Sequence, residues 1–454
     1  MEKENLFLFL EKSDFFPDKT AFAEKRREMG WDGLLTAMQS EVLRSDTFWD
    51  LKRNVVIQGA TSSGKTLLAE LAALRQLTDQ NVSDNKVLFL APLRALVTAH
   101  GRQFRQDFEK VCPNGKKLKI FESSADYQDH DAQIISGDYD IAIIVYEKFF
   151  SMLNERSQIL KGCGLIVVDE LQMLGTERGP RIEFSIMRVL EEQECLQDRQ
   201  IRLMGLTTSE AGIDRLCSWL HAKKLGNNVR PVNLRQRIVS YRPSDAGRWL
   251  EKWVLGENNV PSDTIANPSP ENEQSYPLFT QFTFDRDPNA LKKQCLYSLL
   301  MKEWLDAKPG EGKISYTPQR KALVFNSAKM ASKRMAQELV KKLYLQLPPP
   351  EKETRRAELI SQMDEAIAEF KDEEDVNDLQ KLLPYGVAFH HSGLPAMIRE
   401  YIEEEFQDTS GRIQLIVCTE TLMIGMNLPA DIVILYDGVV FRGAKNPLPL
   451  TLQE

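Results

Sequence analysis

A stretch with two glycines and a lysine–threonine pair constrains this chain more than any other feature: Gly59-Ala60-Thr61-Ser62-Ser63-Gly64-Lys65-Thr66. It follows the apolar run 54–57 and precedes the helix-like run 67–72. This order of strand, glycine-rich loop and helix is typical of a phosphate-binding loop, in which backbone N–H groups surround a polyphosphate. Lys65 would then reach the β- and γ-phosphates, and Thr66 would ligate Mg²⁺. The alternative is an ordinary glycine-rich turn.

Composition limits the class of protein. A chain of 454 residues predicts two or three domains, and 42% hydrophobic with 27% charged residues is typical of a soluble globular protein. The sequence contains no apolar run long enough to cross a bilayer and no signal-peptide pattern. Its six cysteines form no CxxC pair, which favours buried reduced thiols in a cytoplasmic protein, or a nuclear one if the source is eukaryotic. The net charge of −8 disfavours a protein whose surface is covered by nucleic acid, but it is compatible with a local basic groove.

Residues 51–240 alternate short apolar strands with amphipathic helices. The expected strands are 55–58, 86–91, 141–145, 165–168 and 201–206. Such alternation predicts an α/β domain, with a parallel sheet and helices on both of its faces. In open sheets of this kind, ligands bind at the carboxyl ends of the strands. Residues 1–50 precede the domain as a helical segment, in which 34–43 carries apolar residues at helical spacing.

A second series of strands and helices occupies residues 316–454. Its expected strands are 321–326, 386–389, 413–417 and 431–436. The residues between the two series, 241–315, include a stretch rich in Pro, Asn, Ser and Asp, which predicts a linker or surface excursion. Residues 348–383 start with three prolines and continue as a highly charged insertion. We expect solvated helices there, with a partner-binding arm as the alternative. The chain therefore predicts two α/β domains in tandem.

The apolar run 165–168 ends in two adjacent carboxylates, Asp169 and Glu170. A phosphate loop needs an acidic partner for its magnesium, and Asp169 would hold Mg²⁺ directly or through water. Glu170 would orient and deprotonate the attacking water. The alternative is a pair of exposed acids at a strand end. Four preceding apolar residues and a phosphate loop in the same chain favour the catalytic interpretation.

The motifs in this order and spacing resemble those of superfamily 2 helicases of the DExD/H class, and within it the superkiller-type branch. That branch includes RNA helicases and repair helicases related to the polymerase theta motor. The resemblance extends from about residue 35 to the end of the chain and is strongest in the stretch 418–430. It implies two tandem RecA-like domains that bind ATP and Mg²⁺ in the cleft between them. The implied catalytic residues are Lys65, Asp169, Glu170 and Gln172.

The resemblance also assigns residues outside the two central motifs. Gln39 lies twenty residues before Gly59, where the family's glutamine motif contacts adenine, although an ordinary glutamine on an amphipathic helix is equally consistent. Gly425 and Asn427 would lie near the nucleotide at the domain cleft. The residues implied to contact a nucleic-acid backbone are Arg94, Lys148, Asn326, His391, Ser392 and Thr419.

Departures from the family pattern affect the expectations. The stretch 145–148 departs in its first two residues from the branch's usual Thr-Pro-Glu-Lys, so the phosphate role there rests on Lys148 and backbone amides. Gln172 stands where the branch usually has His; Gln donates and accepts hydrogen bonds but takes no charge, so hydrolysis should survive while coupling between the domains changes. The stretch 205–209 keeps hydroxyls but shifts the usual Ser-Ala-Thr of motif III. The arginine-finger motif expected after residue 430 is not found in the chain, so we expect a longer protein and slow hydrolysis without those arginines.

The adjacent histidines 390 and 391 invite two interpretations. A pair of imidazoles suggests a metal site, but neighbours on a strand point to opposite faces and would not chelate one ion. We therefore favour a strand-end loop that touches the nucleic-acid backbone.

The resemblance implies an ATP-dependent helicase or translocase that moves 3′ to 5′, with DNA favoured over RNA. Two alternatives remain open: an RNA helicase of the same branch, and an ATP-gated clamp or scaffold without processive unwinding. A small-molecule kinase would not account for the second α/β series. A role in DNA repair or antiviral defence, with a protein partner such as a nuclease, is a further hypothesis, and no particular residue of the sequence indicates it.

Overall fold

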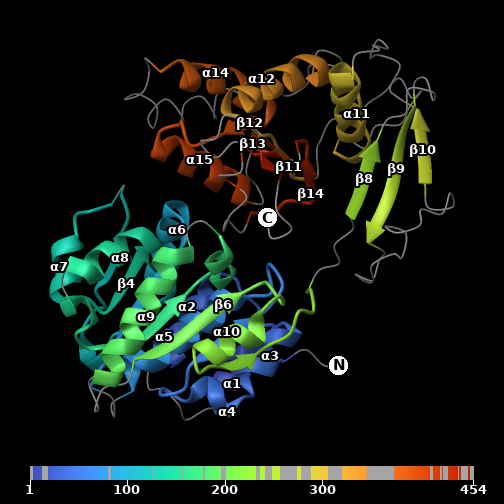
Figure 1. Ribbon diagram of the computed structural model, residues 1–454. Coiled ribbons are helices and arrows are strands. Elements are labelled where there is room, and N and C mark those ends of the chain that lie inside the picture. The colour runs from blue at the N-terminus through green and yellow to red at the C-terminus, as the bar shows by residue number, and fades with distance from the viewer. Residues whose placement is uncertain are drawn as a thin grey trace. The chain divides into compact units, whose positions relative to one another are not determined.

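The chain divides into two compact units, Met1–Val232 and Asn233–Glu454, in the computed structural model (Figure 1). The structure describes residues 4–12, 19–79, 83–125, 127–155, 157–176, 179–195, 201–231, 236–240, 248–255, 273–277, 288–304, 320–344, 373–408, 413–419, 422, 428–437, 439–440 and 448–449. None of the helices in this part of the chain is long and apolar enough to cross a membrane.

A wholly parallel sheet of seven strands forms the centre of the first unit, in the order β3-β4-β2-β5-β6-β1-β7. The strands are β1 (Val55–Gln58), β2 (Lys86–Ala91), β3 (Ile120–Ser123), β4 (Ile141–Val145), β5 (Cys163–Val168), β6 (Arg202–Thr207) and β7 (Lys223–Leu225). All five predicted strands are present, and β1, β2 and β4 have the predicted ends. The sequence did not predict β3 and β7, because these edge strands are partly exposed and lack the apolar run of a strand buried on both faces.

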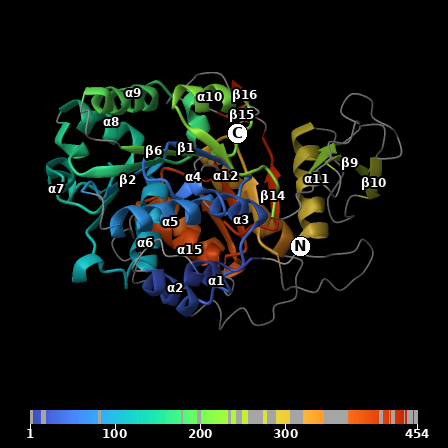
Figure 2. The ribbon, with the colours of Figure 1, turned by 90° about the horizontal axis from the view of Figure 1, so that it is seen from below.

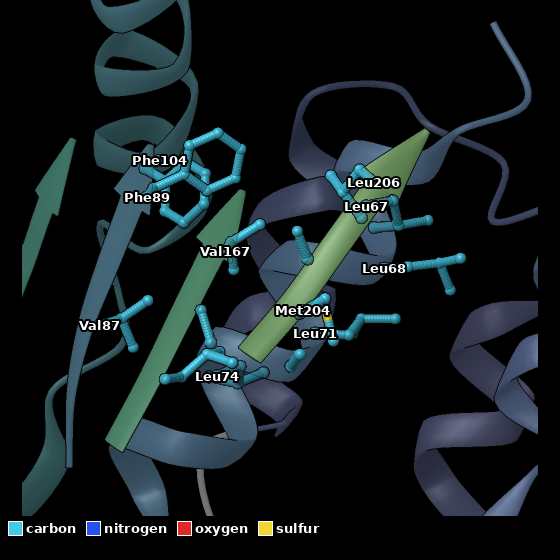
Figure 3. Packing of buried hydrophobic residues seen from close by; sticks show 14 of the residues in the cluster. Leu67, Leu68, Leu71, Leu74, Val87, Phe89, Phe104, Val167, Met204 and Leu206 are labelled. Atoms are coloured by element: carbon cyan, nitrogen blue, oxygen red, sulfur yellow. The ribbon is translucent and has the colours of Figure 1, made fainter. Parts of the chain in front are cut away.

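Helices cover both faces of this sheet. Figure 2 shows α8 and α9 on one side of β2 and β6, with α5 and α6 on the other. The helices of the unit are α1 (Leu6–Lys12), α2 (Lys19–Glu28), α3 (Ala37–Leu43), α4 (Asp46–Trp49), α5 (Lys65–Thr78), α6 (Arg94–Asp107), α7 (Asp131–Ser136), α8 (Tyr146–Glu155), α9 (Gly179–Cys195) and α10 (Ile213–Trp219). Alternate residues of each strand enter different apolar clusters: Val55 of β1 joins one and Val56 the other. In the first cluster, leucines of α5 pack against Met204 and Leu206 of β6 (Figure 3).

The N-terminal helices share the core of this unit. Leu6, Phe22 and Phe48 are fully buried in the same cluster as α5, and each contributes roughly 1.5–3 kcal/mol by burial. The helix predicted at 34–43 is α3, and it starts at Ala37 because Thr36 caps it. The Thr36 side chain accepts a hydrogen bond from the backbone of Gln39, whose own side chain accepts one from the backbone of Thr36.

The second unit contains a four-stranded parallel sheet in the order β12-β13-β11-β14. Its strands are β11 (Ala322–Phe325), β12 (Val387–His390), β13 (Leu415–Cys418) and β14 (Ile432–Leu435). β11 and β14 lie inside the predicted ranges, and β12 and β13 extend one residue beyond the predicted ends. The helices of the unit are α11 (Pro288–Glu303), α12 (Lys329–Leu339), α14 (Glu374–Leu382) and α15 (Ala396–Gln407). Together the two parallel sheets and their helices form a tandem RecA-like α/β fold, as predicted.

The range 241–315, expected as a linker or surface excursion, holds regular structure. It contains two strands of a three-stranded antiparallel sheet, β10-β9-β8, formed by β8 (Gln236–Ser240), β9 (Arg248–Leu255) and β10 (Glu273–Pro277). It also contains α11. Leu300 on this helix and Trp304 directly after it are buried in the apolar core of the second unit. The density of Pro, Asn, Ser and Asp around residue 265 masked these apolar side chains in the sequence. The last described pair of strands is β15 (Val439–Val440) with β16 (Leu448–Pro449).

The charged insertion 348–383 is described only in its last part. There α14 buries Val376, Leu379 and Leu382, so this part of the insertion packs on the domain and is not solvated on all sides. Residues 348–372 lie outside the described residues.

The five cysteines with described side chains are reduced thiols. Cys163, Cys217, Cys295 and Cys418 are buried as expected, whereas Cys112 is exposed. Cys112 follows α6 and lies at the start of a short surface turn, 113–115, which explains its exposure.

Candidate active site

The glycine-rich loop, residues 59–64, connects the end of β1 to the start of α5. Gly64 caps α5 with φ +84°, a left-handed conformation that a side chain strains, and a Cβ there would collide with the Gln39 amide. A Cβ at Gly59 would collide with Ser63 Oγ. The absence of a side chain at both glycines therefore keeps the loop free of these collisions, as a phosphate-binding loop requires. Ala60, Thr61 and Ser62 complete the loop.

Lys65 lies across this loop. Its side chain is buried, and its Nζ donates to the carbonyl oxygens of Gly59 at 2.9 Å and Ala60 at 3.2 Å. Burial lowers the pKa of Lys65, while the charges of Glu170 and Asp169 oppose the change. These weak contacts to neutral carbonyls are the kind that a phosphate oxygen would replace.

The loop also contains a buried polar atom suited to a ligand. Ser63 Oγ is buried, and no group in the described residues hydrogen-bonds to it. Thr66, the second residue of α5, is half-buried beside it. A hydroxyl, an ammonium group and a helix N-terminus together fit the phosphates of a nucleotide and its Mg²⁺.

Helix α3 is attached to the loop at two points. Thr36 Oγ1 donates to the Ser63 carbonyl at 2.9 Å, and Gln39 Nε2 donates to the Gly64 carbonyl at 3.0 Å. The predicted adenine residue therefore lies next to the phosphate loop, where it positions the loop backbone. Its contact with adenine stays a prediction.

Asp169 follows β5 and is held from several sides. Its N–H donates to the Leu90 carbonyl of β2 at 2.9 Å, and its carbonyl accepts a hydrogen bond from the buried Tyr146 hydroxyl of α8. Its Oδ1 accepts from the N–H of Glu170 at 3.0 Å, and its Oδ2 lies 3.1 Å from Nε2 of His100 on α6. Both oxygens are thus oriented while lone pairs remain for a metal ion.

Glu170 has a different environment from its neighbour. Its φ of +51° is uncommon for a residue other than glycine, and such a conformation costs roughly 1–3 kcal/mol. Burial raises the pKa of Glu170, and the charge of Asp169 raises it further, while Lys65 opposes both. A carboxyl with a raised pKa in a site of this kind is suited to accept a proton.

Gln172 connects Glu170 to the end of β6. Its Nε2 donates to the Glu170 carboxylate, and its Oε1 accepts from Thr207 Oγ1 at 2.9 Å and from the N–H of Thr208 at 3.3 Å. The amide thus uses both of its polar ends at once, which a neutral His in one tautomer also does. The replacement of His by Gln keeps a bridge between the two motifs.

The predicted nucleic-acid residues of the first unit differ in their surroundings. Arg94 is exposed at the start of α6. Lys148 on α8 instead forms an ion pair with Asp131 at 2.5 Å and donates to the Ser124 carbonyl at 2.9 Å. A phosphate would have to compete with Asp131 for the Lys148 ammonium.

The second unit brings its predicted residues together at one edge of the sheet. Asn326, His391 and Thr419 follow β11, β12 and β13, which are neighbours. The N–H of Asn326 donates to the Cys418 carbonyl at 2.8 Å, and the N–H of Thr419 to the His390 carbonyl at 3.2 Å. All three side chains are largely buried, and only Ser392 in this group is exposed. Gly425 and Asn427 lie outside the described residues.

The two adjacent histidines have separate partners. His390 Nε2 lies 2.8 Å from Glu403 on α15, whereas His391 Nε2 lies 3.8 Å from Asp375 on α14. His391 also accepts a hydrogen bond from the N–H of Gly393 at 3.1 Å, and burial lowers its pKa. The described residues contain no group of three or more His, Cys, Asp and Glu side chains arranged to hold a metal ion.

The sequence missed two residues that contact Asp169. His100 and Tyr146 come from separate helices, each of which follows a strand next to or near β5 in the sheet. The sheet order needed to place them beside Asp169 could not be read from the strand pattern. Tyr146 had a signal, because it stands where the branch usually has Pro before the Glu-Lys pair 147–148.

Comparison with known proteins matches both units to helicases. The DEAD/DEAH box helicase family matches residues 36–214, and the helicase conserved C-terminal domain matches residues 336–447. The ATP-dependent DNA helicase Hel308 of Pyrococcus horikoshii is 28% identical over 386 residues, covering 85% of this chain and 43% of that protein. Hel308 of Pyrococcus abyssi is 29% identical over 413 residues, covering 90% of this chain and 46% of that protein.

A plant protein is similar to a comparable degree. The DExH-box ATP-dependent RNA helicase DExH14 of Arabidopsis thaliana is 28% identical over 418 residues, covering 88% of this chain and 16% of that protein. The chain therefore spans less than half the length of these relatives. With both helicase domains matched in order and the two motifs placed at one phosphate loop, the chain belongs to the superfamily 2 DExD/H-box helicases, in the branch of Hel308 and the superkiller-type enzymes.

Proposed function

We propose that this chain is the motor part of an ATP-dependent DNA helicase or translocase. The observation that carries the proposal is that Lys65 and the paired carboxylates Asp169 and Glu170 follow nearby strands of one sheet, near enough for the carboxylate charges to act on the Lys65 ammonium group. β1 and β5 both flank β6, so the phosphate loop and the carboxylates lie at the same edge of one sheet. This combination is the one that phosphoryl transfer to water requires.

The residues divide the chemical work. Lys65 would exchange the carbonyls of Gly59 and Ala60 for phosphate oxygens. Thr66 and Asp169 would hold Mg²⁺, which when bound neutralises charge on the phosphates. Glu170 would orient the attacking water and take its proton, and its raised pKa suits it to that role.

The nucleic acid would contact strand-end residues of both units. Arg94 supplies an exposed charge in the first unit, and in the second unit Ser392 is exposed at the sheet edge where the buried side chains of Asn326, His391 and Thr419 lie. Contacts of this kind go mainly to phosphate and sugar, so we expect low sequence preference and strong salt dependence. We favour DNA because several relatives are named as DNA helicases, and 3′-to-5′ movement because the resemblance to the superkiller-type branch implies it.

Nucleic-acid-stimulated ATP hydrolysis tests this proposal in the protein at its native length. Single-stranded DNA should stimulate hydrolysis more than RNA of the same sequence, and a tailed duplex should be separated. Lys65→Ala should lower hydrolysis by at least roughly 100-fold, because it removes a charge aimed at the phosphates. Lys116→Ala, which removes an exposed lysine after a surface turn, is the matched control.

The outcomes distinguish the alternatives. Stronger stimulation by RNA would favour an RNA helicase. The Arabidopsis relative is named as one. Stimulated hydrolysis without displacement of any tailed duplex would favour an ATP-gated clamp. Normal hydrolysis by Lys65→Ala would refute the site.

The cellular setting is also a proposal. We place the protein in the cytoplasm, or in the nucleus of a eukaryotic cell, in a DNA repair or antiviral defence pathway. A nuclease partner would be identified by affinity capture with Lys65→Ala, which should hold its complexes without turnover.

A further inference from the structure

One face of α6 carries polar side chains that contact the nucleotide-binding elements. His100 and Gln103 are three residues apart and therefore lie on the same side of the helix. His100 Nε2 lies 3.1 Å from Asp169 Oδ2, and Gln103 Nε2 donates to Oε1 of Glu70 at 2.7 Å. Glu70 belongs to α5, the helix that begins at the phosphate loop. The same face of α6 thus contacts the magnesium carboxylate and the phosphate-loop helix.

The ring of His100 is fixed by packing. The side chain is buried, and its centroid lies 4.6 Å from that of Phe89 on β2 with an angle of 50° between the planes. Phe104, one helical turn beyond His100, packs edge-to-face with Phe89, and their ring centroids lie 5.5 Å apart (Figure 3). Since a carboxylate oxygen accepts, the tautomer of His100 that satisfies this contact carries its hydrogen on Nε2 and donates it to Asp169.

The bond from His100 fixes the orientation of the Asp169 side chain. Oδ1 of Asp169 is held by the N–H of the next residue, a contact that the backbone provides in any variant. Oδ2 is held by a side chain from a different element, α6. Without His100, the carboxylate could rotate about its own bond while the backbone stayed in place.

We propose that His100 is a positioning residue for Mg·nucleotide binding, which sets the orientation of Asp169 and links it to the helix that starts at Arg94. This inference rests on the proposed function, since Asp169 is the proposed magnesium ligand and Arg94 the proposed phosphate contact. His100 lies six positions after Arg94 in the helix, about 9 Å along the axis. Movement of α6 when a strand binds would therefore reach the carboxylate directly.

Three substitutions separate hydrogen bonding from packing. His100→Phe keeps a ring against Phe89 but has no donor. His100→Gln places an amide nitrogen near the position of Nε2, whereas His100→Asn is shorter and places its nitrogen near that of Nδ1. Gln103→Leu is the matched control, because it alters the same face of α6 and touches Glu70 rather than Asp169.

The main measurement is the binding of fluorescent ADP as a function of Mg²⁺ concentration in the protein at its native length. Residues that orient a metal ligand change metal affinity by 10–100-fold when they are removed. We expect His100→Phe and His100→Asn to raise the half-saturating Mg²⁺ concentration by roughly 10-fold, and His100→Gln to remain within about 3-fold of the natural protein. Gln103→Leu should leave it unchanged.

A second measurement tests the link to α6. The ratio of DNA-stimulated to unstimulated hydrolysis at saturating Mg²⁺ should fall in His100→Phe and recover in His100→Gln. Equal Mg²⁺ dependence in all variants would overturn the proposal. Equal defects in His100→Gln and His100→Phe, with a matching loss of thermal stability, would also overturn it, because packing alone would then explain the histidine.

The Mg²⁺ titration separates this inference from the proposed function. If the natural protein showed no stimulation by nucleic acid, the motor proposal would fail, while the ADP titration would still decide whether His100 orients Asp169.

Discussion

The buried carboxyl groups of Glu70 and Asp107 give the first unit a stability that depends on pH. Glu70 on α5 is fully buried, and Arg26 of α2 pairs with both carboxyls. One guanidinium balances one carboxylate, so the other carboxyl keeps a proton in the folded state. Burial raises the pKa of Glu70 to about 8; Arg26 opposes this rise and Asp107 adds to it.

The sign of the effect follows from the proton count. The usual pKa of a glutamate carboxyl is 4.5, so between pH 4.5 and about 8 the folded state binds a proton that the unfolded state has released. The contribution is therefore complete below pH 4.5 and decreases as the pH rises toward 8, by up to about 1.4 kcal/mol per pH unit. For a unit of this size, that slope corresponds to roughly 3–5 °C in Tm per pH unit.

Glu70→Gln should remove this slope, because an amide is neutral at every pH. Gln103, which donates to Glu70, can turn its own amide over and accept from the new one. Calorimetric scans between pH 6 and 8 would measure the effect, with the transition of the first unit identified by its shift on addition of Mg·ADP. Between these limits the natural protein should lose roughly 5–9 °C relative to Glu70→Gln, since the slope falls to half near pH 8.

The control is Glu183→Gln, which changes an exposed carboxyl on α9 and should follow the natural protein. A parallel pH dependence of Glu70→Gln and the natural protein would refute the reasoning, because Glu70 would then not hold the buried proton.

Three further substitutions or conditions test the active site. Gly64→Ala should abolish fluorescent ADP binding and lower Tm, since the new Cβ would strain a φ of +84° and collide with Gln39; normal ADP binding would contradict the loop geometry. Gln172→Leu should lower hydrolysis by roughly 10-fold by releasing Glu170 from Thr207, and Gln172→His should retain more activity than Leu; equal rates would contradict the bridge. The rate of hydrolysis should rise with pH through a value above 4.5, because the pKa of Glu170 is raised and the base acts deprotonated; an acid limb at or below 4.5 would contradict this.

The strands of both sheets could be predicted because burial on both faces requires continuous apolar sequence. β1, β2 and β4 have the predicted ends, and each is directly preceded by a polar residue, Asn54, Asn85 and Asp140. β3 and β7 escaped because an edge strand is partly exposed and its sequence resembles a loop. The helix α11 escaped for a different reason, since a polar stretch before it outweighed its own apolar face.

The site could be predicted where its residues are neighbours in the sequence. The loop 59–66 is one contiguous stretch and the pair Asp169 and Glu170 is another. Within each stretch, backbone geometry alone brings the groups together. His100 and Tyr146 reach Asp169 only because β4, β2 and β5 are adjacent in the sheet, an order that the alternation of strands and helices leaves undetermined. The contact of Lys148 with Asp131 was hidden for the same reason.

The two adjacent carboxylates, Asp169 and Glu170, have different surroundings. Asp169 directly follows β5 and has both oxygens oriented, by His100 and by the N–H of Glu170. Glu170 takes a left-handed conformation, which turns its side chain toward Gln172, and burial raises its pKa. Environments that treat two carboxyls so differently separate a metal holder from a proton acceptor. Under the proposed function, the backbone turn at Glu170 would thus help to assign the metal contact to Asp169 and the proton transfer to Glu170.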